Sequence, residues 1–191
     1  MLADPWLTRW MPLAVDKAGE APVLEIGCGY GDDTATLAAA GLRVIAFDLS
    51  SASVALAKAR VPSARIECRD VRAPFPADAQ ALGVVVASLS LHYFPWDETV
   101  GIAARVREVL RPGGVLLCRL NSTQDHHFGA GRGEEIEPGY FRLNGQCKRF
   151  FDEPAVRRLF AEGWTMRSLE HRVTRKYIRR KAAWEAVLER A

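Results

Sequence analysis

The chain has 191 residues, of which 49% are hydrophobic and 26% are charged, and its formal net charge at pH 7 is +3. This length and composition are typical of a single globular α/β domain, here residues 1–191, and they exclude an intrinsically disordered protein. No apolar run reaches about 18 residues, and the N-terminus lacks a basic region followed by an apolar one, so we expect a cytoplasmic protein with no membrane partner.

In chain order, short apolar runs alternate with longer amphipathic stretches, which is the pattern of βαβ units around a mainly parallel sheet. Apolar and β-branched runs predict strands at residues 21–27, 43–48, 64–70, 82–90, 115–121 and 164–174. Helical periodicity and capping residues predict helices at residues 33–40, 51–60, 96–110 and 153–162. Asp152 is the predicted N-cap of the last helix, and the proline-rich residues 73–76 predict a loop.

Two later segments are harder to assign. Residues 121–150 are rich in glycine and polar residues without a strong period, so they predict an irregular connection. Their aromatic residues favour a flap over a binding site rather than a plain linker. Residues 182–190 have helical propensity, yet their alternation of apolar and acidic residues also suits a half-buried strand. Local sequence alone favours the helix.

The stretch EIGCGYGDD, residues 25–33, joins the first predicted strand to the first predicted helix. A strand, a glycine loop and a helix N-terminus together present free backbone N–H groups to a nucleotide-like ligand. The dinucleotide fingerprint needs a glycine where this chain has Asp32, and carboxylates at a helix N-terminus repel a pyrophosphate. A ligand with a cationic part and no phosphate fits better. A glycine turn with capping aspartates and no ligand stays open as the alternative.

Acidic residues also end the second and third predicted strands. Asp48 stands where a carboxylate can accept hydrogen bonds from both hydroxyls of a ribose, and Asp70 ends the next strand. Each of them alone is more often a turn residue or a helix cap. Their recurrence at the carboxyl ends of neighbouring strands, where open α/β sheets bind ligands, favours a binding role.

With these residues, the sequence resembles the class I S-adenosylmethionine-dependent methyltransferases over residues 22–121. The resemblance rests on LEIGCGYG for the E-x-G-x-G-x-G loop, FDLS for the ribose acid, RDVRAPFP for the adenine contact, and ASLSLHYF and VREVLRPGGVLL after them. More narrowly, the chain resembles the small stand-alone methyltransferases of the type-11 and tellurite-resistance kind. The family implies an α/β fold with a Rossmann-like, doubly wound, seven-stranded sheet that is mostly parallel. On this resemblance we assign residues 182–190 to its antiparallel seventh strand.

The resemblance also implies S-adenosylmethionine as the cofactor. Backbone at Gly27 and Gly29 would hold the methionine end, Asp48 would bind the ribose, and Asp70 with the Val71 N–H would read the adenine edge. Glu25 would support the loop, and Leu49 would lie against the adenine. The residues expected at the cofactor are Glu25, Gly27, Cys28, Gly29, Asp48, Leu49, Asp70, Val71, Ser88 and Leu89.

Residues after the fourth predicted strand should lie under the transferred methyl group, so His92 and Tyr93 are the candidate catalytic residues, as a base or to orient the acceptor. Packing as a half-buried histidine is the alternative for His92. Candidate acceptor contacts lie in an N-terminal helical cover, residues 1–21, and in the flap: Trp6, Trp10, His126, His127, Tyr140 and Arg149. The alternatives are core tryptophans and a surface histidine pair. No metal site is predicted, because adjacent histidines diverge and the four cysteines form no CxxC pair.

Several acceptor classes are disfavoured by the residues after the fourth strand. The segment SLSLHYF is not the Asn/Asp-Pro-Pro-aromatic tetrad expected for methylation of base amino groups. It also has no cysteine nucleophile for cytosine C5 methylation and no acid for metal-assisted transfer to a catechol.

A basic run near the C-terminus bears on the acceptor. Residues 172–181 carry six cations and no acid: Arg172, Arg175, Lys176, Arg179, Arg180 and Lys181. In the family topology this run is a turn at the rim of the cofactor mouth, where its field would attract an anion. We therefore predict methyl transfer to a small-molecule, anionic acceptor. The alternatives are an RNA methyltransferase and a non-catalytic S-adenosylmethionine-binding module; Asp32 disfavours a nicotinamide-dependent oxidoreductase.

Overall fold

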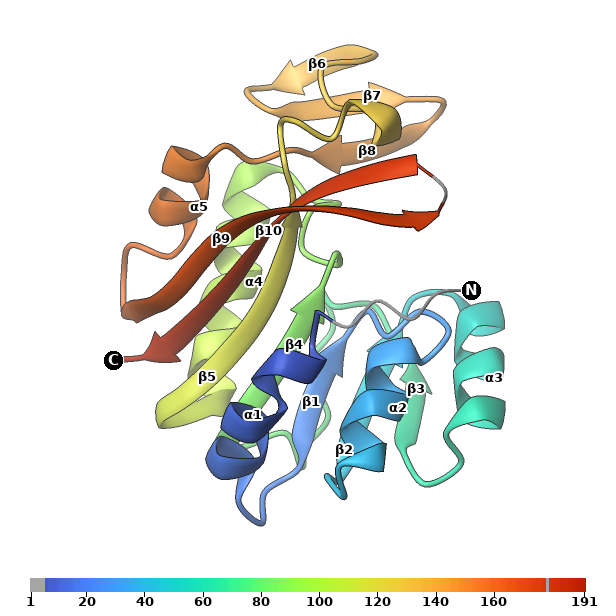
Figure 1. Cartoon of the computed structure of the whole chain (residues 1–191), viewed down its shortest axis with the longest axis vertical. Coiled ribbons are helices and arrows are strands. Elements are labelled where there is room, and N and C mark those ends of the chain that lie inside the picture. Colours follow the sequence, from blue (N-terminus) through green and yellow to red (C-terminus); the bar gives the residue numbers. More distant parts are fainter. Residues whose placement is uncertain (1–5, 178) are drawn as a thin grey trace.

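The computed structural model describes residues 6–177 and 179–191 and contains an open, twisted sheet of seven strands (Figure 1). The strand order is β3-β2-β1-β4-β5-β10-β9, and β10 alone runs antiparallel to the others. The strands are β1 (Val23–Ile26), β2 (Val44–Asp48), β3 (Arg65–Cys68), β4 (Leu82–Ser88), β5 (Leu110–Asn121), β9 (Trp164–Tyr177) and β10 (Arg179–Arg190). The predicted doubly wound, Rossmann-like sheet is confirmed.

Helices cover both faces of this sheet. One face carries α1 (Met11–Ala18), α2 (Asp32–Ala39) and α3 (Ser51–Arg60), and the other carries α4 (Trp96–Val109) and α5 (Glu153–Leu159). Alternate residues of the strands pack into two separate hydrophobic cores. In β4, Val84 and Val86 pack in the core beneath α1, α2 and α3, whereas Val85 and Ala87 pack in the core beneath α4 and α5. The central strands are therefore apolar on both sides, as expected for a buried parallel sheet.

Capping residues begin the helices where the sequence predicts. The Asp152 carboxylate accepts a hydrogen bond from the Ala155 N–H at 2.8 Å and caps α5, and Ser50 Oγ accepts one from Ser53 N–H at 3.2 Å and caps α3. The proline-rich link before β4 contains no regular element, as predicted. A short 3-10 helix, η1 (Thr8–Trp10), precedes α1.

The helix-prone segment at the C-terminus is a strand. Residues of β10 pair with β5 from Ala183 opposite Asn121 to Glu189 opposite Val115, and on the other side with β9. Two sets of ladder hydrogen bonds and the burial of Ala186 and Leu188 outweigh the helical propensity of the isolated segment. The assignment made from the family resemblance is confirmed.

The segment predicted to be irregular is largely ordered. A 3-10 turn, η2 (His126–Phe128), is followed by an antiparallel sheet of β6 (Glu134–Glu137), β7 (Tyr140–Leu143) and β8 (Gln146–Arg149), which we call the flap sheet. Asn144 and Gly145 join β7 to β8 with φ of +50° and +75°. An Asn-Gly pair is a strong hairpin signal, so the expectation of an irregular connection was wrong where local turn chemistry could have corrected it.

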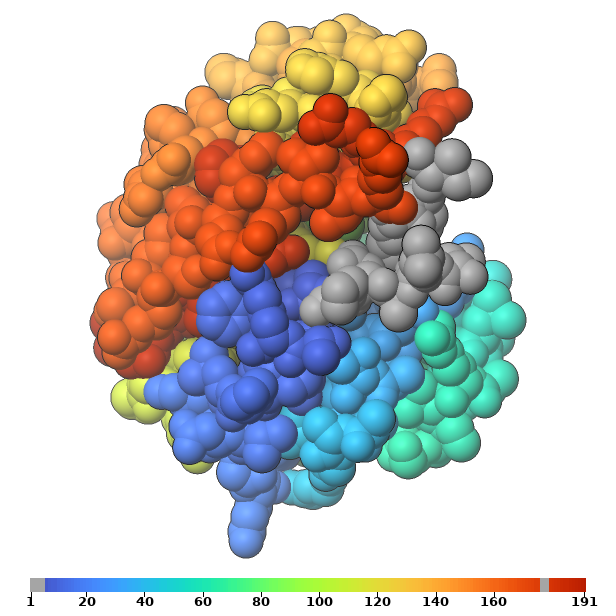
Figure 2. All heavy atoms as spheres, viewed as in Figure 1, coloured from blue at the N-terminus to red at the C-terminus, as the bar shows by residue number. Residues whose placement is uncertain are grey.

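The basic run is mostly strand and not turn. Pairing of β10 with β5 stops at Ala183, but pairing of β10 with β9 continues to Arg179 opposite Tyr177. Residues 172–177 and 179–182 thus form a two-stranded extension beyond the main sheet, which we call the basic ribbon. Figures 1 and 2 show it, in orange-red, running beside the flap sheet. In the ranges that the structure describes, no helix is both long and apolar enough to cross a membrane.

Candidate active site

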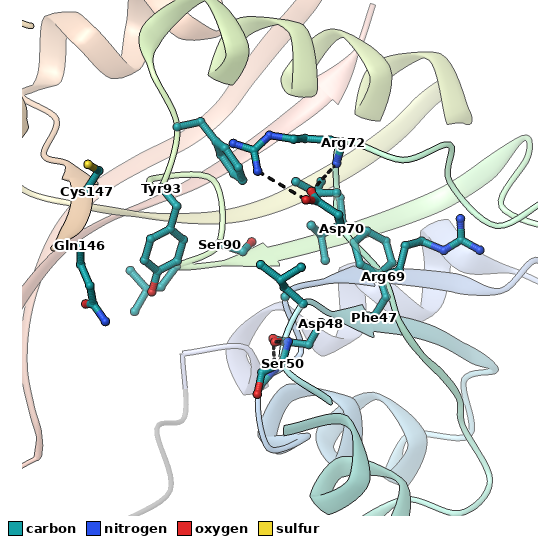
Figure 3. A pocket seen from close by; sticks show the side chains of 17 residues that line it. Phe47, Asp48, Ser50, Arg69, Asp70, Arg72, Ser90, Tyr93, Gln146 and Cys147 are labelled. Atoms are coloured by element: carbon teal, nitrogen blue, oxygen red, sulfur yellow. Dashed lines mark hydrogen bonds and ion pairs between the residues drawn. The ribbon is translucent and has the colours of Figure 1, made fainter. Parts of the chain in front are cut away.

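A cavity of about 780 Å³ opens at the carboxyl ends of β1, β2, β3 and β4 (Figure 3). In open α/β sheets this edge, where neighbouring strand connections diverge to opposite faces, is the usual place for a ligand. Figure 3 shows Tyr93 and Gln146 across the cavity from Asp48 and Ser50. The lining residues are Ile26, Gly27, Gly29, Phe47, Asp48, Leu49, Ser50, Arg69, Asp70, Val71, Arg72, Leu89, Ser90, Tyr93, Phe94, Gln146 and Cys147.

The glycine loop forms one wall with its backbone. Gly27 and Gly29 have φ of +73° and +53°, in the left-handed region that side chains disfavour. A Cβ atom on Gly27 would lie 2.5 Å from the Cβ of Ser90, whereas a Cβ on Gly29 would meet nothing within 4 Å. Gly27 is therefore required both by its conformation and by the close approach of the loop after β4. The Gly27 N–H donates to the Phe47 carbonyl and the Gly29 N–H donates to Asp48, so the carbonyl oxygens of the two glycines are the backbone groups that the loop offers to a ligand.

Asp48 ties the loops after β1 and β2 together. Its Oδ2 accepts a hydrogen bond from the Gly29 N–H and its Oδ1 accepts one from the Ser50 N–H, each at 2.9 Å. A carboxylate has about four lone-pair sites, so two remain for hydroxyl groups of a ligand. The next residue, Leu49, is 68% exposed although it is a large apolar side chain. It offers apolar surface beside a polar anchor, which suits an aromatic base joined to a sugar.

The wall after β3 is built around Asp70. Its Oδ1 accepts a hydrogen bond from the Arg72 N–H at 2.8 Å, which closes a tight turn next to Val71. The Arg72 guanidinium lies 4.8 Å from the centre of the Phe94 ring and pairs with Glu98. This turn therefore joins the loop after β3 to the loop after β4.

Three residues expected at the cofactor lie behind the lining. Glu25 is 2% exposed and accepts a hydrogen bond from Thr34 Oγ1; burial, with a smaller contribution from Asp33, raises its pKa to about 8. The Cys28 side chain is buried, and burial raises its pKa to about 12. Ser88 Oγ accepts a hydrogen bond from Arg119 Nε at 2.9 Å. In this structure they support the loops and do not face the cavity.

The two candidate catalytic residues occupy different places. Tyr93 lines the cavity and is 46% exposed, whereas His92 is 3% exposed and lies behind it, with ring centroids 4.2 Å apart. Burial, then the charges of Lys181 and Lys148, lower the pKa of His92 well below its usual value, so the ring is neutral. Burial and the nearby Asp48 carboxylate raise the pKa of Tyr93, so its phenol stays protonated at neutral pH.

Two features of the loop after β4 were not expected from the sequence: the strained backbone of Leu89, a residue that the sequence predicts at the cofactor, and the unpartnered hydroxyl of Ser90. Leu89 lines the cavity with φ of +55°, a strained value for a non-glycine residue, and such strain concentrates at functional sites. Ser90 Oγ is buried without a hydrogen-bond partner, although Ser90 lines the cavity. Gln146 and Cys147 were also missed, because the β7–β8 hairpin that carries them was not predicted.

The N-terminal tryptophans do not line the cavity. Trp6 is 5% exposed, its Nε1 donates to both oxygens of Asp33 at 2.9 and 3.0 Å, and its ring lies 4.5 Å from the Arg119 guanidinium. Trp10 packs against the core beneath α1 and α2. Both residues pin the segment before α1 to the sheet, in place of the acceptor contacts expected of them.

The flap candidates are also placed differently from expectation. His126 and His127 are exposed on η2 and do not line the cavity. Tyr140 and Arg149 are buried in the flap sheet, at 6% and 2% exposure, and contact the loop after β4. Asp125, which precedes the two histidines, is buried and pairs with Lys181. No group of three or more His, Cys, Asp or Glu side chains suited to a metal occurs among the described residues.

Comparison with known proteins identifies the family. Residues 23–114 match the methyltransferase domain family. The chain is 34% identical over 107 residues to trans-aconitate 2-methyltransferase of Variovorax paradoxus, covering 55% of this chain and 40% of that protein. It is 29% identical over 124 residues to the putative methyltransferase YqeM of Bacillus subtilis, covering 63% and 49%. By this match and these relatives, residues 23–114 form a methyltransferase domain of the class I S-adenosylmethionine-dependent kind. The chain spans less than half the length of these relatives.

Solved structures agree with this methyltransferase fold. The chain superposes on a methyltransferase of Methanosarcina mazei with a TM-score of 0.78 at 18% identity, covering 94% of this chain and 97% of that one. It superposes on the magnesium protoporphyrin IX methyltransferase of Synechocystis, solved with bound S-adenosylmethionine, with a TM-score of 0.69 at 14% identity, covering 97% and 78%. S-adenosylmethionine is the cofactor of this family, as the sequence predicts.

The cavity fits this cofactor chemically. The carbonyl oxygens of Gly27 and Gly29 suit the ammonium of an amino-acid end, Asp48 keeps free lone pairs for ribose hydroxyls, and Leu49 exposes apolar surface for a base. A volume of about 780 Å³ lies within the range of small-molecule and cofactor sites, roughly 300–1,000 Å³.

Proposed function

We propose that this methyltransferase transfers the methyl group of S-adenosylmethionine to a small-molecule acceptor whose attacking atom already carries a negative charge. The cofactor occupies the side of the cavity formed by the glycine loop and the loops after β2 and β3. The acceptor occupies the side formed by Tyr93, Gln146 and Cys147, which faces the other side across Ser90 (Figure 3).

The roles at the cofactor follow from the contacts available. The backbone of Gly27 and Gly29 holds the methionine end, Asp48 binds the ribose hydroxyls, and Leu49 packs on the adenine. Asp70 and the Val71 N–H bind the adenine edge. Glu25, Cys28 and Ser88 act from behind these loops, because none of them lines the cavity.

The bound cofactor supplies an electrophilic methyl group on a sulfonium. Transfer is an in-line displacement in which the acceptor's electron pair forms the new bond to carbon, and the electrons of the carbon–sulfur bond stay on sulfur. The protein must align the acceptor and exclude water, and it needs a base only if the acceptor carries a proton.

The observation that carries the proposal is the lack of a free base on the acceptor side of the described cavity. His92 lies behind Tyr93, and its lowered pKa makes it a weak base. The Tyr93 phenol stays protonated, so Tyr93 is a hydrogen-bond donor that orients the acceptor. Asp48 and Asp70 are bonded to the backbone of their own loops. A carboxylate or another anion needs no base and therefore fits this site.

The charge around the acceptor side supports the same class of acceptor. Lys148 follows Cys147 on β8 and lies near enough to Lys181 to lower its pKa, and Arg179 and Arg180 are exposed on the basic ribbon. Lys181 itself does not add free charge, contrary to the sequence-based expectation. Its side chain is only 12% exposed; it forms an ion pair with Asp125 and donates a hydrogen bond to Asn121 Oδ1.

A methyl-transfer screen with radiolabelled cofactor tests the proposal. Carboxylic acids, thiols, amines, oxyanions of tellurium and selenium, and bulk tRNA are the substrate classes. Cys147→Ser tests whether the Cys147 thiol, which lines the acceptor side, acts as a base. We expect turnover with a carboxylate or another anion, in the wild type and in Cys147→Ser. The relatives named trans-aconitate 2-methyltransferases act on an anion of this kind.

Three outcomes would overturn this proposal. Turnover only with neutral amines or thiols would contradict the anionic acceptor. Turnover with tRNA, falling steeply as salt rises, would favour an RNA methyltransferase. Tight binding of S-adenosylmethionine by calorimetry without turnover on any class would favour a non-catalytic binding module.

A further inference from the structure

We propose that Arg149 and Glu137 of the flap sheet form a buried latch that fixes the backbone of residues 92–96, so that Arg149 is a positioning residue for Tyr93. The flap sheet then sets the geometry of the active site instead of only covering it. The consequence for catalysis rests on the proposed function, whereas the latch itself can be tested without turnover.

The first observation is that the flap sheet holds three consecutive carbonyl groups of the loop after β4. Arg149 N–H donates to the His92 carbonyl at 2.7 Å, Tyr140 Oη donates to the Tyr93 carbonyl at 2.9 Å, and Arg149 Nε donates to the Phe94 carbonyl at 3.4 Å. Strands β7 and β8 thus donate hydrogen bonds to the carbonyl of Tyr93 and to the carbonyls of the residues before and after it.

The second observation is the latch between these contacts. Arg149 is 2% exposed; its Nη1 donates to the Pro138 carbonyl at 3.0 Å and its Nη2 pairs with the Glu137 carboxylate. Glu137 Oε1 also accepts a hydrogen bond from the Trp96 N–H at 2.6 Å, at the start of α4. A single ion pair therefore joins β6, β8 and the far end of the loop.

Packing closes the latch on its two sides. The Arg149 guanidinium lies 5.4 Å from the centre of the Trp96 ring and 5.1 Å from that of Tyr140. Burial lowers the pKa of Arg149 to about 10, and the group stays charged at neutral pH. Removing Glu137 would leave the buried Arg149 charge unpaired, whereas removing Arg149 would leave a carboxylate that is 32% exposed, so the loss of Glu137 forces the larger rearrangement.

The link to chemistry is the position of Tyr93. Its side chain is 46% exposed in the cavity, so backbone fixation and the His92 ring beside it determine where its hydroxyl points. A misplacement of about 1 Å can cost roughly 100-fold in rate when catalysis depends on alignment. Arg149 does not line the cavity, and it therefore acts through the loop without touching the acceptor.

Hydrogen exchange of the full-length protein tests the latch directly. Arg149→Met and Glu137→Gln should both accelerate exchange in residues 92–97, including the Trp96 N–H, and leave the glycine loop unchanged. The matched controls are Arg157→Met and Glu134→Gln, which remove exposed ion pairs on α5 and β6. They should exchange like the wild type. Unaltered exchange in residues 92–97 of both latch variants would overturn the proposal, whether or not an acceptor is known.

Kinetics with the acceptor found in the screen test the positioning role. Arg149→Met should lower kcat about 100-fold, with affinity for S-adenosylhomocysteine within about twofold of the wild type. In a Tyr93→Phe background the same change should cost less than about threefold, because both act through one group. Fully additive effects, or an unchanged kcat in both latch variants, would contradict it. Glu137→Gln, which is closer in shape to the native residue, decides the question if Arg149→Met does not fold.

Discussion

Asp48 shows how one carboxylate serves the structure and the ligand at once. Its two oxygens hold the Gly29 and Ser50 N–H groups, and its remaining lone pairs point at the cofactor side of the cavity. A residue with both duties cannot be replaced without affecting both loops. Substitutions that keep one side-chain oxygen or remove both can separate the role in holding the loops from the role in binding the ligand.

Asp48→Ala should weaken binding of S-adenosylmethionine by about 1–3 kcal/mol, because ribose hydroxyls lose their acceptor in a partly buried site. Asp48→Asn keeps one acceptor oxygen and should lose less. Calorimetry measures both affinities, and thermal melts without cofactor measure any loss of loop stability. Wild-type affinity in Asp48→Ala would remove Asp48 from the ribose site.

Glu25 makes the stability of the fold depend on pH. Its folded pKa of about 8 lies above the usual value of 4.5, so the folded state binds a proton that the unfolded state releases between these values. Stability should therefore fall as the pH rises from about 4.5 to about 8, and stay low above that range. Glu25→Gln removes this titration and keeps an oxygen that can accept from Thr34.

The free energy of unfolding of Glu25→Gln minus that of the wild type should increase as the pH rises. We expect this difference to be about 3–5 kcal/mol larger at pH 8 than at pH 4.5. Urea unfolding of both proteins at several pH values gives this difference in the free energy of unfolding. A constant difference between pH 5 and pH 8 would mean that the carboxylate is ionised in the folded protein throughout.

At the scale of elements, the β7–β8 hairpin brings Gln146 and Cys147 into the lining of the cavity. Its turn needs Gly145 at φ +75°, with open space where a Cβ would lie. In contrast, Gly101 lies in α4, and a Cβ there would also meet nothing. The two glycines differ only in backbone conformation, so they form a matched pair.

Gly145→Ala should destabilise the protein by about 1–2 kcal/mol, because an L-residue is strained at this φ. Gly101→Ala should stabilise it by about 0.5–1 kcal/mol through helix propensity and a less flexible unfolded chain. Denaturant titration measures both changes. Equal effects of the two substitutions would show that the turn does not hold the left-handed conformation.

For the whole molecule, charge is distributed unevenly around the cavity. The basic ribbon and the flap sheet lie side by side (Figure 2), and Arg179 and Arg180 are exposed on the ribbon. Lys181 belongs to the interior, where it neutralises Asp125. The exposed arginines of the ribbon therefore contribute a positive electrostatic field. The end of the ribbon beside Asp125 contributes to the stability of the fold.

Reversing the charge of Arg179 and Arg180 to glutamate should raise the KM for an anionic acceptor. The effect should shrink as ionic strength rises above about 0.15 M, where the Debye length is near 8 Å. Lys58→Glu, on the last turn of α3, is the control for a charge change away from this ribbon. A KM that does not respond to salt would argue against electrostatic attraction of the acceptor.

The sequence by itself determined the strands β1 to β4, the helices between them, and the cofactor side of the cavity. These features rest on local signals: the apolar runs, the EIGCGYG loop, and the acids Asp48 and Asp70 at strand ends. Each of these signals lies within a few residues, along the chain, of the strand, loop or helix that it predicts. They were sufficient to predict the family and its cofactor.

Only the tertiary structure decided the parts that depend on partners far away in the chain. Residues 182–190 become a strand because β5 and β9 offer ladders on both sides, and Lys181 is buried because Asp125 lies beside it. Arg149 turns inward because Glu137 and the loop after β4 hold it. Each outcome is fixed by pairing and desolvation between distant segments, which no local pattern of residues encodes.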